Sequence, residues 1–219
     1  GQVFKDTFAM SSRAQPLGWR SVFWPLFWTV LVMASLWFLY RAVHFAVTRD
    51  PQPNATFLNR QLWYYGHMVT AVPLLLIGPL QFSQKLRAAR PRIHRMMGRI
   101  FLGGSVLAGL LASYIGATIQ YEGSRLPLAF FGLVWVCFAI AAWLTAHAKV
   151  FPLHRKFVIR TYAIALAFIW VRVLERFDSY FFPFIQDQGI RDTTTEWLSF
   201  MLPLVVAETY VSWWPDLRK

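Results

Sequence analysis

Six stretches of the chain are apolar enough, and long or nearly long enough, to cross a lipid bilayer. The hydrocarbon core needs about 20 mostly apolar residues per helix, and residues 21–40 carry no charged side chain at all. The expected spans are 21–40, 62–82, 100–119, 126–148, 157–174 and 197–214. The sequence therefore predicts an all-α protein, a polytopic transmembrane helical bundle of six spans that forms a single domain over residues 21–214.

The composition agrees with lipid as the solvent. Hydrophobic residues make up 57% and charged residues 15% of the chain, against about 45–50% and about 25% in soluble domains. The net charge of +12 would suggest nucleic acid in a soluble protein, but no stacking platform or groove-reading motif accompanies it. We expect the lipid bilayer and other membrane subunits as partners, and no nucleic acid.

The basic residues also predict the orientation of the spans. Fifteen of the 22 Lys and Arg residues fall in one set of alternating loops and seven in the other, and the richer side faces the cytoplasm. Both ends are then cytoplasmic, with short tails over residues 1–20 and 215–219. We expect a multi-pass protein of the bacterial inner membrane.

Several chemistries are excluded by what the chain lacks. Its single cysteine, Cys137, allows no intrachain disulfide and no multi-cysteine metal or iron–sulfur site within these residues. There is no Walker loop, nucleophile elbow, HExxH pair or glycine-rich dinucleotide loop.

The informative feature is a pattern that recurs in two cytoplasmic hairpins. Each hairpin has a proline, then a histidine and an arginine, then a second arginine, and these are Pro91, His94, Arg95 and Arg99 in the first and Pro152, His154, Arg155 and Arg160 in the second. A proline favours the first turn of a helix, so both histidines should open helices that enter from the same side.

Two further residues belong to this side of the membrane. His147 ends the fourth span, so a tight turn would bring it near His154. Glu208 lies about 9 Å deep at 1.5 Å per residue, and an ionisable group at that depth is expected to have a partner. Arg160 is the expected partner. On the outer side, His67 is a buried polar residue or marks a quinol site.

These residues predict a cofactor site for haem or quinone with a role in electron transfer. A phospholipid headgroup would use the same residues without a metal. His94 and His154 would be axial metal ligands or proton carriers, and His147 an alternate ligand. Arg95, Arg99, Arg155 and Arg160 would neutralise anionic groups. Alternatively, the basic residues reflect topology alone, and the chain is a non-catalytic accessory subunit, or a small transporter with the Arg160–Glu208 pair in its pathway.

The same motifs resemble a bacterial family of predicted membrane proteins known only as a domain of unknown function. The resemblance covers roughly residues 60–175. It rests on His67, on His94-Arg95-x-x-Gly98-Arg99, and on the run from Ala146-His147 through His154-Arg155-Lys156 to Arg160-x-Tyr162-Ala163. It implies that His67, His94, His147 and His154 are the functional histidines of the family.

Overall fold

The structure, a computed structural model, describes residues 19–48, 55–119 and 122–217. In these ranges the chain is helical and has no β-strand, which confirms the predicted all-α class. The helices are α1 (Trp19–Thr48), α2 (Ala55–Gln81), α3 (Gln84–Ala89), α4 (Pro91–Ala117), α5 (Glu122–His147), α6 (Phe151–Ala165), α7 (Ala167–Arg176), α8 (Asp178–Phe181), α9 (Gln188–Glu208), the π-helical segment η2 (Thr209–Trp213) and α10 (Trp214–Leu217).

Each expected span falls on a helix or on consecutive helical segments, the last one on α9, η2 and the start of α10. By length and composition, α4, α5 and the α6–α7 run from Phe151 to Arg176 are able to cross a membrane. Every one of these helices begins before its expected span, whereas α2, α4 and α5 end one or two residues before the expected end. Helix α9 begins at Gln188 rather than at residue 197, and helix continues to Leu217 where a tail was expected. The expected N-terminal tail lies outside the described residues as far as residue 18.

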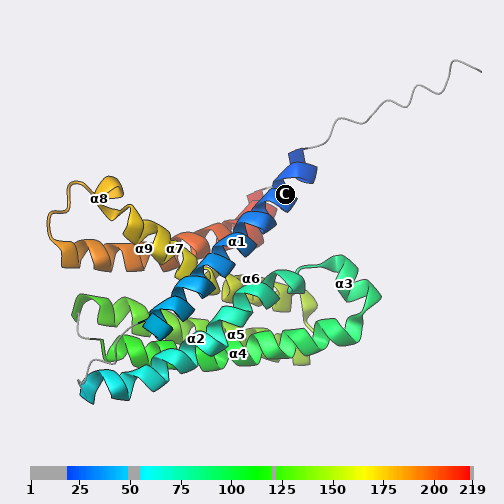
Figure 1. The fold of residues 1–219 in the computed structure, drawn as a ribbon. Helices are drawn as coiled ribbons and strands as arrows, with labels where there is room; N and C mark the ends of the chain where they lie inside the picture. Colours follow the sequence, from blue (N-terminus) through cyan, green and yellow to red (C-terminus); the bar gives the residue numbers. More distant parts are fainter. Residues whose placement is uncertain (1–18, 49–54, 120–121, 218–219) are drawn as a thin grey trace, which may run out of the picture.

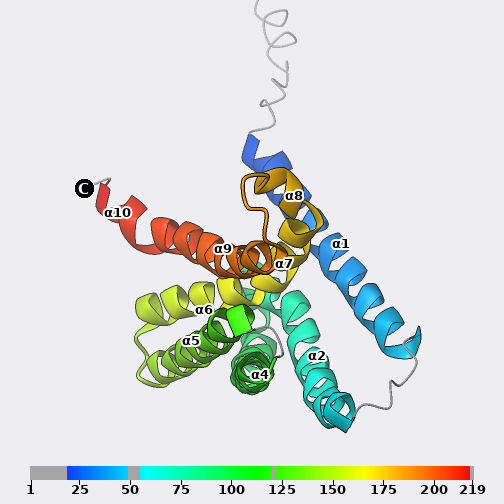
Figure 2. The same ribbon diagram turned by 90° about the vertical axis from the view of Figure 1, so that its left-hand side faces the viewer.

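The helices are arranged so that α3 and α8 mark opposite ends of the molecule (Figure 1). Helix α4 packs along α2 and α5, and α6 packs along α5 and α9. Viewed from the α8 end, α5 lies between α4 and α6, while α1 lies at the periphery beside α2 and α7 (Figure 2). The connection of α2 to α4 through α3 and the turn between α5 and α6 therefore meet at the α3 end.

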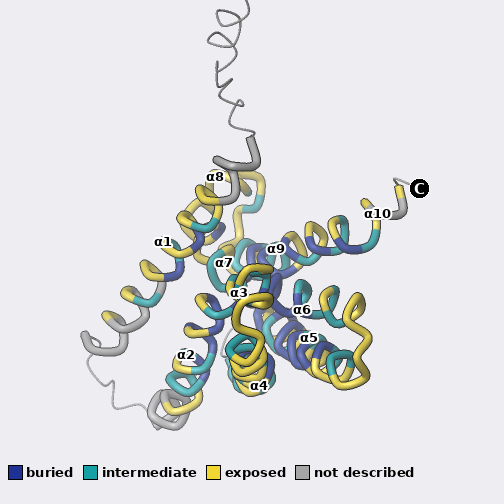
Figure 3. The backbone as a smooth tube through the Cα atoms, turned by 90° about the vertical axis from the view of Figure 1, so that its right-hand side faces the viewer, coloured by how far each residue is buried: buried dark blue, intermediate teal, exposed yellow. Residues whose placement is uncertain are grey.

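Small residues allow the closest helix contact, between α4 and α5. A Cβ atom on Gly132 would lie 2.3 Å from Ser113 Oγ and 2.8 Å from the Ser113 backbone nitrogen, and one on Gly109 would lie 2.9 Å from the Gly132 carbonyl oxygen. Such close backbone approach is typical of membrane helix pairs. The buried residues of the pair lie between Phe101 and Gly116 on α4 and between Ser124 and Ala142 on α5, and Figure 3 shows buried stretches on α5.

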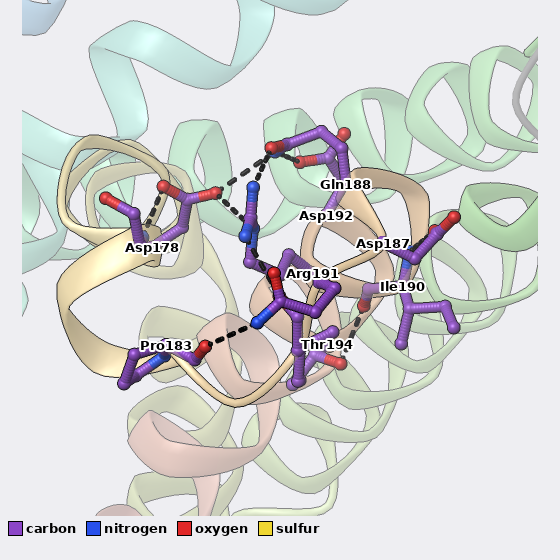
Figure 4. A network of polar contacts seen from close by, with 11 residues as sticks. Asp178, Pro183, Asp187, Gln188, Ile190, Arg191, Asp192 and Thr194 are labelled. Atoms are coloured by element: carbon purple, nitrogen blue, oxygen red, sulfur yellow. Dashed lines mark hydrogen bonds and ion pairs between the residues drawn. The ribbon is translucent and has the colours of Figure 1, made fainter.

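A polar network orders the connection between α8 and α9 (Figure 4). Asp178 Oδ2 accepts a hydrogen bond from Gln188 Nε2 at 3.0 Å and lies 3.2 Å from Arg191 Nε. Arg191 Nη1 also donates to the Ile185 carbonyl at 2.9 Å. The Gln188 hydrogen bond, the Ser179 backbone N–H and the Arg191 charge hold the pKa of Asp178 below its ordinary value. The connection is thus fixed by an ionised carboxylate.

Candidate cofactor cavity

A cavity of about 950 Å³ opens at the α3 end and is lined by residues of α2 to α6. Its walls bring together six of the residues singled out from the sequence, namely His94, Arg95, Arg99, His147, His154 and Arg155. These residues come from three helices and are up to 61 positions apart in the chain. The cavity has the size of a site for a cofactor-sized ligand, for which volumes of about 300–1,000 Å³ are usual.

Helix N-termini place two of the histidines. Pro91 is the first residue of α4 and Pro152 lies in the first turn of α6, where the missing N–H of proline costs no hydrogen bond. His94 and His154 follow within the same first turns, and their backbone N–H groups bond to the Arg90 and Val150 carbonyls. The recurring sequence pattern therefore corresponds to a recurring local structure.

A Schellman turn places His147 beside them. Lys149 has a left-handed backbone with φ of 59°, and the N–H groups of Val150 and Lys149 bond to the Thr145 and Ala146 carbonyls at 2.9 and 3.1 Å. This pair of bonds closes the end of a helix. The turn reverses the chain within a few residues and brings the last residue of α5 to the same cavity as the first turn of α6.

The histidines differ in how their rings are held. His154 Nδ1 lies 2.8 Å from the Ala142 carbonyl oxygen. Because a carbonyl only accepts, Nδ1 carries the proton and Nε2 keeps its lone pair, which is the usual arrangement of a ligating histidine. The buried Nδ1 of His94 has no hydrogen-bond partner in the described part of the chain. His154 is therefore the better-oriented ring.

His67 does not line the cavity. Its ring is buried in α2, where Nδ1 donates to the Ala108 carbonyl at 2.9 Å and the ring centroid lies 4.9 Å from that of Phe168. The contact ties α2 to α4 in the core of the bundle. His67 is thus a buried polar residue, which was one of the two expectations for it. The histidines that line the cavity are His94, His147 and His154.

Arg160 and Glu208 form the expected ion pair, but outside the cavity. Arg160 Nε and Nη2 donate to the two carboxylate oxygens at 2.9 Å each, and Arg160 Nη2 lies 3.4 Å from Ser212 Oγ. The pairing is confirmed, whereas the expectation of one common cluster with the histidines is wrong for these two residues. From its position on α6, the Arg160 side chain extends to α9 and η2 and does not line the cavity.

The π-helical segment η2 connects this ion pair with the cavity. Its Tyr210 hydroxyl accepts a hydrogen bond from Arg155 Nη2 at 3.2 Å, and Arg155 lines the cavity. Its Ser212 lies beside Arg160. The wider turn of a π-helix changes which side chains face a neighbour, and such segments are frequent at functional sites.

Two residues of the cavity were missed in the sequence analysis. Gln81 ends α2 and Arg87 belongs to α3, and both line the cavity. Gln81 interrupts an apolar run between Leu80 and Phe82, which was the available signal. The segment that forms the short helix α3 was expected to be a loop. The sequence analysis therefore did not predict that Arg87 lines the cavity. Within the described residues, no three His, Cys, Asp or Glu side chains gather as a metal site.

Together, the apolar helices and the cavity that collects histidines and arginines at one end define an α-helical integral membrane protein of the bundle type. The sequence model of the family described as Predicted membrane protein (DUF2306) matches residues 64–211. The chain belongs to this family, whose function is unknown. The match extends through α9 and into η2, beyond the region that the motifs alone suggested. Comparisons with the curated proteins and with the solved structures find no match.

Proposed function

We propose that the cavity at the α3 end is the cofactor site of a membrane redox protein, and that it binds haem. The observation that carries the proposal is the convergence of three histidines and four arginines from different elements on one cavity. Haem would supply one-electron transfer. By the distribution of basic residues, the site would face the cytoplasm from a bacterial inner membrane.

The donor set fits a haem group. Helix α5 lies between α4 and α6 (Figure 2), so His94 and His154 approach the cavity from helices on either side of α5. His154 presents Nε2 as a ligand because its Nδ1 is engaged with Ala142, and His147 is available as an alternate ligand. The Arg95, Arg99 and Arg155 guanidinium groups suit the propionates, since they bind carboxylates in bidentate fashion.

A specific observation favours quinone as a second candidate. Gln81 Nε2 and His94 Nδ1 are buried and have no hydrogen-bond partner in the described ranges, and both residues line the cavity together with Trp143 and Phe151. Buried polar atoms without partners are costly. The carbonyl oxygens of a quinone would accept from the Gln81 amide, and from His94 Nδ1 in the tautomer that is protonated there. The aromatic side chains would contact the ring.

The haem proposal is tested by the absorption spectrum of the full chain purified from membranes of haem-supplemented cells. We expect a Soret band that is lost in the His154→Ala and His94→Ala variants. His67→Asn is the matched control, because an asparagine amide can still donate to the Ala108 carbonyl and the residue lies outside the cavity. The control should keep the band.

The quinone candidate is tested on the same preparations with a short-chain ubiquinone. Binding should quench the fluorescence of Trp143. The amplitude of the quenching should decrease in Trp143→Phe, and the affinity for the quinone should decrease in Gln81→Leu. The redox proposal would be overturned if the purified protein is colourless, takes up no haem and shows no saturable quenching. The accessory-subunit hypothesis would then be favoured.

A further inference from the structure

The walls of the cavity are strongly unbalanced in charge. Four guanidinium groups line it, those of Arg87, Arg95, Arg99 and Arg155, and among the described residues no Asp or Glu side chain does. Arg155 is engaged with Tyr210. The guanidinium groups of Arg87, Arg95 and Arg99 make no hydrogen bond or ion pair with the described part of the chain. Their charge is therefore left for a ligand or for solvent.

A buried side chain distinguishes this arrangement from an ordinary basic surface. Gln81 is only 9% exposed, it lines the same cavity, and its Nε2 has no partner. Its Oε1 packs against Gly98, where a Cβ atom would come within 3.1 Å. A buried amide N–H without an acceptor is costly, and an ordinary patch of solvated arginines would not require one beside it.

The local structure brings three of these arginines to the same cavity as this amide. The Ser83 side chain caps α3 by accepting from the Leu86 N–H at 3.2 Å, which fixes the turn that carries Arg87. Arg95 and Arg99 are four residues apart on α4 and share one face of the helix. Gly98 lies between them and leaves room for the Gln81 amide.

We infer that Gln81, Arg87, Arg95 and Arg99 form an anion subsite that binds a phosphoryl group. All four side chains offer N–H donors, and a phosphoryl group combines several acceptor oxygens with more negative charge than one carboxylate. The group can come from the headgroup of an anionic lipid or from a soluble phosphate. The subsite shares Arg95 and Arg99 with the propionate contacts proposed for haem. The inference goes beyond the redox proposal because it rests on the Gln81 amide and Arg87 as well, and on none of the histidines.

The experiment measures the binding of two probes to the purified full chain in neutral detergent. Native mass spectrometry follows phosphatidic acid, with phosphatidylcholine as the reference lipid, and isothermal titration calorimetry follows inorganic phosphate. We expect saturable binding that weakens at least about tenfold in the Arg95→Gln/Arg99→Gln variant, since charged hydrogen bonds contribute about 1.5–3 kcal/mol each, and several-fold in Gln81→Leu.

Two controls make the result specific. Arg176→Gln, which removes an exposed charge at the other end of the molecule, should bind both probes like the wild type. His154→Ala should keep the phosphoryl site even where it loses haem, so a failed redox proposal is told apart from a failed anion subsite.

Each outcome decides the inference. Binding of phosphatidic acid alone assigns the subsite to a lipid headgroup, and binding of phosphate assigns it to a soluble ligand. No saturable binding of either probe at millimolar concentration would overturn the inference, as would an equal loss of binding in Arg176→Gln, because that result would mean general electrostatic attraction.

Discussion

The ion pair between Arg160 and Glu208 should behave as a coupled unit in stability measurements. The structure gives it two parallel N–H···O bonds of 2.9 Å each, with the Arg160 side chain 16% and the Glu208 side chain 32% exposed. Breaking a fully buried pair by removing one partner costs about 3–5 kcal/mol. Partial exposure of the carboxylate and the reach of arginine toward the headgroups lower the expected cost.

We therefore expect Arg160→Gln and Glu208→Gln each to lower the free energy of unfolding by about 2 kcal/mol. The double variant leaves no uncompensated charge, and its two amides can bond to each other. It should also lose only about 2 kcal/mol, so the coupling free energy is about 2 kcal/mol. The assay is equilibrium unfolding in mixed micelles by SDS titration, followed by tryptophan fluorescence and circular dichroism.

The matched control is the exposed pair of Arg172 and Glu175, which lie 2.6 Å apart but are 48% and 39% exposed. The same cycle on this pair should give a coupling below about 0.5 kcal/mol, as for surface pairs within a helix. If the Arg160–Glu208 double variant loses the sum of the two single losses within about 0.5 kcal/mol, the pair is uncoupled and the argument from intramembrane charge is refuted.

Three further predictions follow from other parts of the fold. Gly132→Ala should lose about 1–3 kcal/mol through overpacking against α4, while Gly103→Ala, whose Cβ would meet nothing within 4 Å, should be neutral or slightly stabilising in the same titration. Because the pKa of Asp178 is held below its ordinary value, the ionised carboxylate should stabilise the α8–α9 connection at neutral pH, and this stabilisation should be lost as the pH falls below about 4. Asp178→Asn should accelerate hydrogen exchange of the connection already at pH 7. Unchanged exchange would contradict this prediction. Reporters fused at residue 90 should be cytoplasmic and at residue 188 external, and the same side for both would exclude the six-span arrangement.

Local features of the sequence were enough to predict the helices and part of the cavity. Long apolar runs allow little besides a membrane helix, because an unpaired backbone is not tolerated in lipid. The proline before His94 and the proline before His154 start helices by fixing φ, which is a property of the residue itself. The two histidines were therefore expected on equivalent first turns, and they lie there and line one cavity.

Tertiary packing decided which polar residues share that cavity. Arg160 follows His154 by six residues, which is about one and two-thirds helical turns. Its side chain therefore points in a different direction from that of His154 and reaches α9. Gln81 joins the cavity only because α3 folds the chain back and Gly98 leaves space beside it. Contacts between helices that are distant in the sequence depend on crossing geometry, and single-sequence periodicity carries no information about it.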